Sequence, residues 1–158
     1  MTSTTTRTVV VNAAFLQEVK DDNVILQDLL ATASYLLDPS ERCYVRPRDL
    51  AELFAQLRDQ LATHFSLEEA LGYLEDVIVT SPRYCERAFH LRAEHETLYL
   101  QIAELADEAY RIVRSGNSVE LPVLLHAFRE FCAKLKRHEL AEDELILDAL
   151  YDELGVGD

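Results

Sequence analysis

Apolar residues recur along most of the chain at alternating spacings of three and four, which is the pattern of an amphipathic helix. The pattern forms four stretches, at about residues 10–37, 46–77, 83–114 and 118–154. Because the connections are short, neighbouring helices are expected to run antiparallel, and stripes of this spacing pack at a small crossing angle. The sequence therefore predicts an all-α fold, an up-down-up-down antiparallel four-helix bundle.

Segments rich in proline, glycine and serine separate the predicted helices. The sequence DPS at residues 38–40 ends the first helix, because proline disfavours a helical conformation in the residue before it. The sequence TSP at residues 80–82 breaks the chain after the second helix. The sequence SGNS at residues 115–118 separates the last two, with Gly116 as the terminator of one helix and Ser118 as the N-cap of the next.

Composition supports a single helical domain. The chain has 158 residues, of which 49% are hydrophobic, and only four glycines and four prolines interrupt it. This length is enough for one domain with a substantial core, and the scarcity of helix breakers favours helices throughout. We expect a flexible N-terminal tail at residues 1–8 and the bundle at residues 9–158.

Charge and cysteine content limit the partners and the compartment. The formal net charge of −14 disfavours nucleic acid and anionic membranes as partners, because both would repel an acidic surface. No apolar run approaches the roughly 20 residues that span a bilayer. The three cysteines are widely spaced and include no Cys-x-x-Cys pair, which favours neither disulfides nor a zinc cluster. A reducing cytoplasm is therefore the expected location.

Two of the apolar stripes carry the same polar pair, a histidine followed four residues later by a glutamate. His64 and Glu68 continue the second stripe, and His138 and Glu142 continue the fourth. Residues four apart share one face of a helix, so all four side chains are expected to face the core. A buried carboxylate normally becomes protonated, forms an ion pair or binds a metal, because an unpartnered buried charge is strongly unfavourable. The pattern predicts a metal site inside the bundle.

The other two helices bring polar residues to the same depth. His95 lies on the third stripe and Asn23 on the first. Counted from the turns at one end of the bundle, Asn23 and the three stripe histidines lie within about one helical turn of one another. They are expected to form one layer. The remaining polar candidates are assigned to the surface or outside the site: Asp22 (unless the first helix is rotated), Glu69, His90 and His126.

Three segments resemble a known family. HFSLEE (64–69), RAEHETL (92–98) and RHELAEDE (137–144) are similar to the hemerythrin-like, or HHE cation-binding, domains. The resemblance extends from about residue 12 to 154 and implies a four-helix bundle that holds a non-haem iron pair through histidines and two bridging carboxylates. It implies metal ligands at these positions: His64, Glu68, His95, His138 and either Glu142 or Asp143. The apolar stripe favours Glu142, since Asp143 is displaced by about 100° around the helix.

Two positions depart from the family pattern. Asn23 stands where a first-helix histidine is usual, and Leu91 stands where hemerythrins proper have a second histidine in the third helix. Three histidines and two carboxylates remain, enough for one well-coordinated ion or for two ions with open positions. A degenerate member that has lost its metal is an alternative. If one ligand is missing, histidine at position 23 is expected to raise iron affinity.

The expected function is that of a non-haem iron protein, with one or two ions, that binds or senses oxygen, iron or a small reactive molecule. One alternative is a metal-free bundle that acts as an interaction module. Another is a di-iron oxidase-like or peroxidase-like enzyme that uses an open metal position. As a sensor, the chain would act through a homodimer or a separate signalling partner. Nucleophilic triads, phosphate loops and dinucleotide fingerprints are not evident in the sequence.

Overall fold

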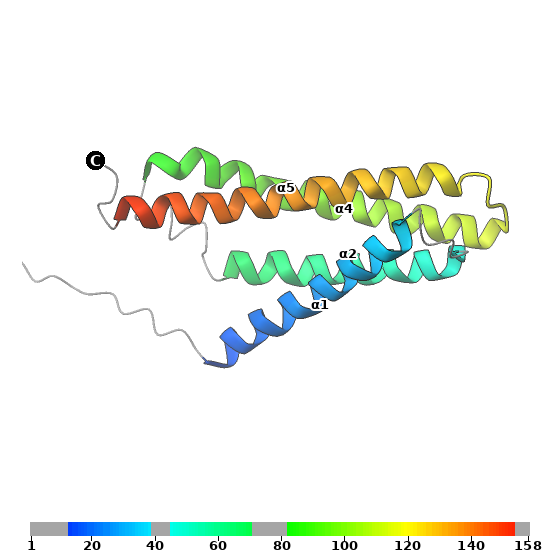
Figure 1. Ribbon diagram of the computed structural model, residues 1–158, viewed down its shortest axis with the longest axis horizontal. Helices are drawn as coiled ribbons and strands as arrows, with labels where there is room; N and C mark the ends of the chain where they lie inside the picture. The colour runs from blue at the N-terminus through cyan, green and yellow to red at the C-terminus, as the bar shows by residue number, and fades with distance from the viewer. Residues whose placement is uncertain (1–12, 39–44, 71–81, 154–158) are drawn as a thin grey trace, which may run out of the picture.

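The computed structural model describes residues 13–38, 45–70 and 82–153. Successive helices pack against each other in an antiparallel arrangement, and the described residues include no strand. The elements are α1 (Ala13–Leu37), α2 (Pro47–Ala70), the short 3-10 helix η1 (Pro82–Tyr84), α4 (Cys85–Ser115) and α5 (Leu121–Glu153). The predicted all-α bundle is confirmed (Figure 1). No helix in the described ranges combines the length and the apolar character that crossing a bilayer requires.

The apolar stripes form the core, as the spacing predicts. Leu57, Leu98 and Leu135 are 0%, 4% and 1% exposed. Phe54 of α2 and Phe128 of α5 are fully buried and bring their ring centroids to 4.2 Å across the bundle. Side chains of this size contribute most of the apolar area that a small domain removes from water, so these contacts hold the helices in register.

The core is divided along its length. A large cluster of buried residues extends along all four helices, and a smaller cluster joins η1, α4 and α5. The smaller cluster consists of Tyr84, Ala88, Leu91, Leu145 and Ala149. Buried polar residues of α4 and α5 lie between these clusters in the sequence: His95, His138 and Glu142. The polar layer is therefore enclosed by apolar packing on both sides.

The turn signals are confirmed in part. Gly116 adopts the left-handed conformation, with φ of 66°, and its N–H donates to the carbonyl of Ile112, so it ends α4 as predicted. The prediction of Ser118 as an N-cap is wrong, because α5 begins later, at Leu121. The side chain of Asn117 accepts the N–H of Val119 instead, which prolongs the turn. The predicted tail at residues 1–8 and the last part of the second helix, residues 71–77, lie outside the described residues.

Helix α1 departs most from the expected arrangement. It packs mainly on α2 and crosses it obliquely, with its N-terminal end directed away from α4 and α5 (Figure 1). The prediction that Asn23 faces the core is wrong. Asn23 is exposed, whereas Asp22 is only 4% exposed. The buried face of α1 therefore contains Asp22 and Leu26, not Asn23. One residue corresponds to about 100° around the helix, and α1 is rotated by about that amount relative to the prediction.

Candidate metal centre

Three buried histidines from three helices meet in the polar layer. His64 of α2, His95 of α4 and His138 of α5 are 7%, 4% and 3% exposed. The rings of His95 and His138 lie 5.0 Å apart, edge to face. Phe65 stacks on His95 at 4.2 Å and meets His138 with its edge. Phe65 therefore limits the rotation of both rings and keeps water from their apolar side.

Glu142 holds two of these histidines together. Its Oε1 atom is 3.1 Å from Nε2 of His95 and 3.1 Å from Nε2 of His138. Among the described residues, His95, His138 and Glu142 form the group whose ligand atoms all lie within 4.8 Å of one another. Two imidazole nitrogens and a carboxylate oxygen at this spacing can bind a single cation.

Glu68 connects this group to the third histidine. Its Oε1 atom is 2.8 Å from Nε2 of His64, and its Oε2 atom is 3.4 Å from Nε2 of His95. The two oxygens of one carboxylate thus reach two separate imidazoles. The residues predicted from the two polar pairs and His95 do converge, in one continuous cluster.

Each histidine also has a carboxylate behind it. The Nδ1 atoms of His64 and His138 are 2.7 Å from Asp22 and Glu94, and Nδ1 of His95 is 3.4 Å from Glu69. A carboxylate at Nδ1 retains the proton there and leaves Nε2 free to bind a metal. All three Nε2 atoms face the shared interior. This arrangement is common among histidines that ligate metals.

Several buried polar atoms of the described residues make no hydrogen bond of good geometry, although those of the histidines and glutamates lie within ion-pair distance of one another. Among the described side chains these atoms are Nε2 of His64, Oε2 of Glu68, Nε2 of His138 and Oε1 of Glu139, together with Oε1 of Gln101. All but the last belong to the polar layer. Buried polar atoms nearly always make hydrogen bonds. Several buried atoms that face one another without hydrogen bonds therefore need a specific explanation. Cations bound in this layer would satisfy these nitrogen and oxygen atoms, and the residues therefore fit a metal.

The electrostatics of the cluster favour positive charge. Burial lowers the pKa of His64, but the surrounding carboxylates outweigh burial and raise it to about 11. The pKa of His138 is also raised, since Glu142 and Glu94 outweigh the effect of burial. Burial raises the pKa of Glu142, but His138 and His95 outweigh burial and hold it at about 2. The cluster concentrates more carboxylate charge than its imidazoles balance, as a cation site requires.

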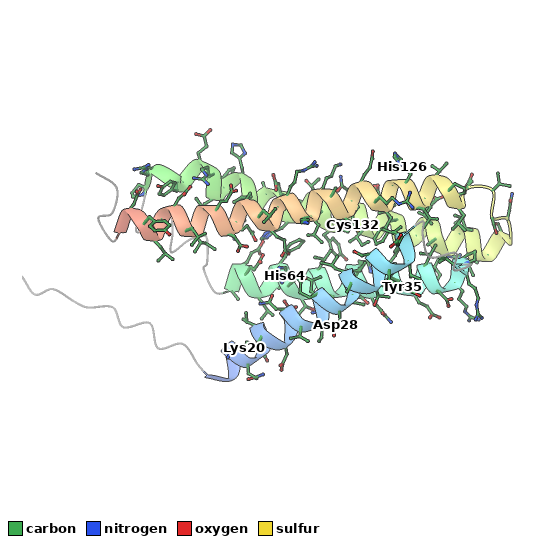
Figure 2. The ribbon with its side chains drawn as sticks, viewed as in Figure 1. Lys20, Asp28, Tyr35, His64, His126 and Cys132 are labelled. Carbon is green, nitrogen blue, oxygen red and sulfur yellow. The ribbon has the colours of Figure 1, made fainter. Side chains whose placement is uncertain are left out.

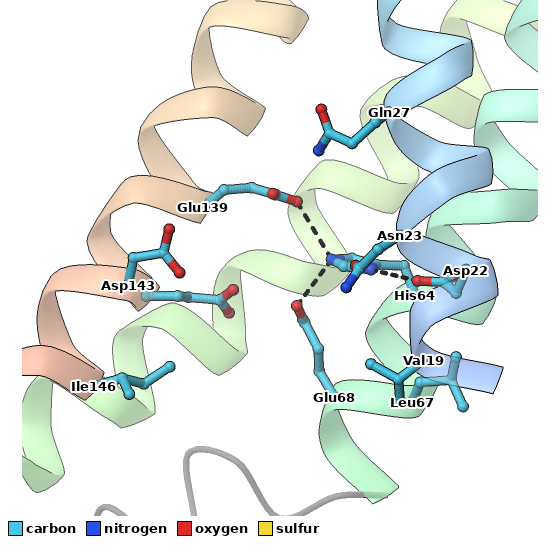
Figure 3. A pocket seen from close by; sticks show the side chains of 11 residues that line it. Val19, Asp22, Asn23, Gln27, His64, Leu67, Glu68, Glu139, Asp143 and Ile146 are labelled. Atoms are coloured by element: carbon cyan, nitrogen blue, oxygen red, sulfur yellow. Dashed lines mark hydrogen bonds and ion pairs between the residues drawn. The ribbon is translucent and has the colours of Figure 1, made fainter. Parts of the chain in front are cut away.

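A cavity of about 380 Å³ leads to the cluster between α1 and α5 (Figure 3). Its polar lining includes His64, Glu68, Glu139 and Glu142, and Asn23 and Asp143 also line it. Both Asn23 and Asp143 are exposed. Of the two alternatives for the fourth-helix carboxylate, Glu142 contacts the histidines and Asp143 lines the cavity. The cavity gives small molecules a route to the buried nitrogen atoms.

Comparison with known families agrees with this geometry. The chain matches the family model described as the hemerythrin HHE cation-binding domain over residues 14–150. It belongs to that family. No curated protein and no solved structure matches the chain. The buried cluster of His95, His138 and Glu142 is thus the metal-capable cluster of an HHE domain.

The remaining residues of the HHE domain test the sequence assignments. His90 and His126 are exposed, as predicted, and Figure 2 shows His126 on the outer side of α5. Leu91 is buried in the smaller apolar cluster. Asp22 and Glu69, which were assigned outside the site, instead support His64 and His95. The periodicity of a single helix does not predict such carboxylates, because each contacts a histidine of a neighbouring helix.

Proposed function

We propose that this HHE domain binds non-haem iron, as one or two ions, and presents it to oxygen or another small reactive molecule. The observation that carries the proposal is the orientation of the histidines. Each places a carboxylate behind Nδ1 and directs Nε2 into a shared interior with unpaired oxygen atoms. Imidazole and carboxylate donors together suit iron.

The composition of the cluster supports iron over metals that prefer sulfur. Cys85 is exposed and Cys132 is half-buried, and neither lies among the residues of the cluster. The set of nitrogen and oxygen donors resembles that of oxygen-reactive iron sites more than that of structural zinc sites, which are usually rich in thiolates.

In this proposal, His95, His138 and Glu142 hold one ion, and His64 and Glu68 extend the site toward the cavity. Phe65 fixes the rings of His95 and His138 and covers one face of His95. The cavity of about 380 Å³ admits a small molecule from the α1 side. Bound iron would supply a Lewis-acidic and redox-active position. A sensing role would further require a homodimer or a separate signalling partner.

Metal analysis of matched variants tests the proposal. The wild-type chain and two variants, His138→Ala and His126→Ala, are expressed with added iron and purified without chelator. Both histidines lie on α5, but His138 is in the cluster and His126 is exposed, so His126→Ala controls for the loss of an imidazole. We expect His138→Ala to lose most of its iron and His126→Ala to match the wild type.

An absorption spectrum with and without oxygen then tests small-molecule binding. We expect the spectrum of the iron-loaded wild type to change on exposure to oxygen. Equal iron content in the wild type and His138→Ala would contradict the assignment of the site. A wild type that retains no iron, manganese or zinc after reconstitution would favour the metal-free bundle.

A further inference from the structure

A second cavity, of about 430 Å³, lies between α4 and α5. It shares no lining residue with the cavity between α1 and α5. Leu98 and Ala141 form its apolar part, and polar side chains of both helices line the rest: Glu94, Thr97, Gln101, Lys134, Arg137 and His138. A cavity of this size with a few convergent polar groups is typical of sites that bind small molecules.

Two basic side chains of α5 line this cavity without a carboxylate partner. Within the part of the chain that the structure describes, neither Lys134 nor Arg137 forms an ion pair. Glu94, the acidic residue of the cavity, contacts Nδ1 of His138 at 2.7 Å instead. Unpaired bases are unexpected in a chain with 29 acidic and 15 basic residues. Two positive charges held together without a counter-charge attract an anion.

The register of the two helices explains why Lys134 has no partner. Further along the same interface, Arg87 of α4 donates to Asp148 of α5 at 2.8 Å. Because the helices are antiparallel, a shift of fourteen residues along each one, in opposite directions, leads to Gln101 and Lys134. The flanks of packed helices often carry opposite charges at such positions. Here α4 presents an amide where a carboxylate would neutralise Lys134.

The amide of Gln101 also lacks a hydrogen bond. Its Oε1 atom is buried and has no hydrogen-bond partner. A carbonyl oxygen can only accept, so the missing partner is a donor such as a hydroxyl group. Buried acceptors are nearly always bonded, and neither Lys134 nor Arg137 donates to this one. The cavity therefore lacks an anion and a hydrogen-bond donor at neighbouring positions.

We propose that this cavity binds a small 2-hydroxycarboxylate. The carboxylate contacts Arg137 and Lys134, and the hydroxyl donates to Oε1 of Gln101. A carboxylate suits Arg137, because a planar guanidinium can bind both of its oxygens. Since Gln101 and Lys134 face each other across the cavity, the hydroxyl must lie next to the carboxylate. Glu94 at the other end disfavours a doubly charged phosphate by like-charge repulsion.

Calorimetric titration of the full chain with lactate and with propionate tests the inference. The two acids share one carbon skeleton, and only lactate carries the 2-hydroxyl. Each titration is done with the chain as purified and again after treatment with chelator. We expect lactate to bind in both cases, about three- to tenfold more tightly than propionate, which is the range for one hydrogen bond. Absence of lactate binding overturns the inference. So does binding that disappears with the metal, because it would place lactate on the metal.

Arg137→Gln and Lys136→Gln are matched variants. Both remove an exposed base from the same turn of α5, but Lys136 lines a different cavity, on the α1 side. Lys136 is also unpaired among the described residues. We expect Arg137→Gln to weaken lactate binding by at least about tenfold, since hydrogen bonds between charged groups are the stronger ones, and Lys136→Gln to match the wild type. Equal losses would indicate a general attraction to bases and would overturn the site.

Gln101→Leu tests the contact with the hydroxyl. The variant is expected to bind lactate and propionate equally, with its affinity for propionate unchanged. A preference for lactate that persists would show that the hydroxyl does not contact Gln101. Titration with inorganic phosphate tests the anion, and phosphate that binds more tightly than lactate would overturn the assignment of a carboxylate. Thermal unfolding followed by circular dichroism checks that each variant folds.

The inference stands apart from the proposed function. The cavity can bind lactate whether or not the bundle holds a metal, so the chelator-treated chain tests this site alone. Loss of iron from His138→Ala, in turn, tests the metal centre without lactate.

Discussion

The two sides of the polar layer differ in how tightly they are packed. On one side, α2, α4 and α5 pack closely around His95 and His138, and Phe65 stacks against their rings, although a cavity of about 430 Å³ between α4 and α5 reaches His138 and Glu94. On the other, α1 leans away from α5, and a cavity reaches His64 and Glu139. The first side, called the closed side for its helix packing, fixes the ligand geometry, and the open side beside α1 exposes His64 and Glu68 to the cavity. A bundle can thus hold a buried cluster and still admit a small molecule, if one helix carries less of the packing.

The largest expected effect lies in the closed side of the core. Phe128 is fully buried against Phe54, so Phe128→Ala is expected to lower the free energy of unfolding by about 3–5 kcal/mol. Denaturation by urea measures this change. Val24→Ala on α1, where Val24 is 61% exposed, should alter stability by no more than about 0.5 kcal/mol. Similar losses for the two variants would mean that the burial of Phe128 does not stabilise the bundle.

Glu142→Gln should have the largest effect on metal binding. The substitution preserves the shape of the side chain but removes the charge that faces His95 and His138. We expect the affinity of the site for metal to fall on the order of 100-fold, the upper end of what is seen for residues that merely support ligands. Calorimetric titration measures the change. Glu144→Gln, at an exposed position of the same helix, is the control, and equal affinities would exclude Glu142 as a ligand.

Asp22→Asn tests the contribution of α1. Asp22 is 2.7 Å from Nδ1 of His64, and its loss should let the ring rotate and change tautomer. We expect the affinity of the site for metal to fall by about tenfold. The neighbouring variant Asp21→Asn removes an exposed carboxylate from the same helix and should have no effect. If Asp22→Asn left metal affinity unchanged, Asp22 would not support His64 as a ligand.

The smallest effect is expected from Asn23→His. The sequence alone predicts a gain in iron affinity, because position 23 continues an apolar stripe. In the structure Asn23 is exposed at the edge of the cavity. Histidine there should change stability by no more than about 0.5 kcal/mol and leave the iron content per chain unchanged. A clear rise in iron content, measured by elemental analysis, would show that α1 rotates toward the cluster.

The sequence was sufficient to predict whatever depends on one helix at a time. The burial of Leu57, Leu98 and Leu135 follows from spacing alone, and so does the inward direction of His64 and His138. Asp22 could not be assigned in this way. Steps of three and four both continue the stripe from Val19 to Leu26, so Asp22 and Asn23 fit equally well. The choice between them depends on how α1 packs against α2.

Glu139 and Glu94 were missed for a related reason. Each follows or precedes a buried histidine by one position, which places it about 100° from the stripe of its own helix. Glu139 reaches His64 because α1 leaves space beside α5, and Glu94 reaches His138 across the interface of α4 and α5. Interhelical distances of this kind are not encoded in the periodicity of a single helix.

The division of the core by the polar layer has a consequence for cooperativity. Within the described residues, the smaller apolar cluster joins η1, α4 and α5, and it has few large side chains. Such a cluster should open locally at a lower free energy than the main core. His95, His138 and Glu142 lie between this cluster and the main core. An ion bound to them would cross-link α4 and α5 there and make the two clusters unfold together. Amide hydrogen exchange should then slow near Ala88 and Ala149 when metal is added. Each of these residues lies about two helical turns from the metal-binding residue of its own helix.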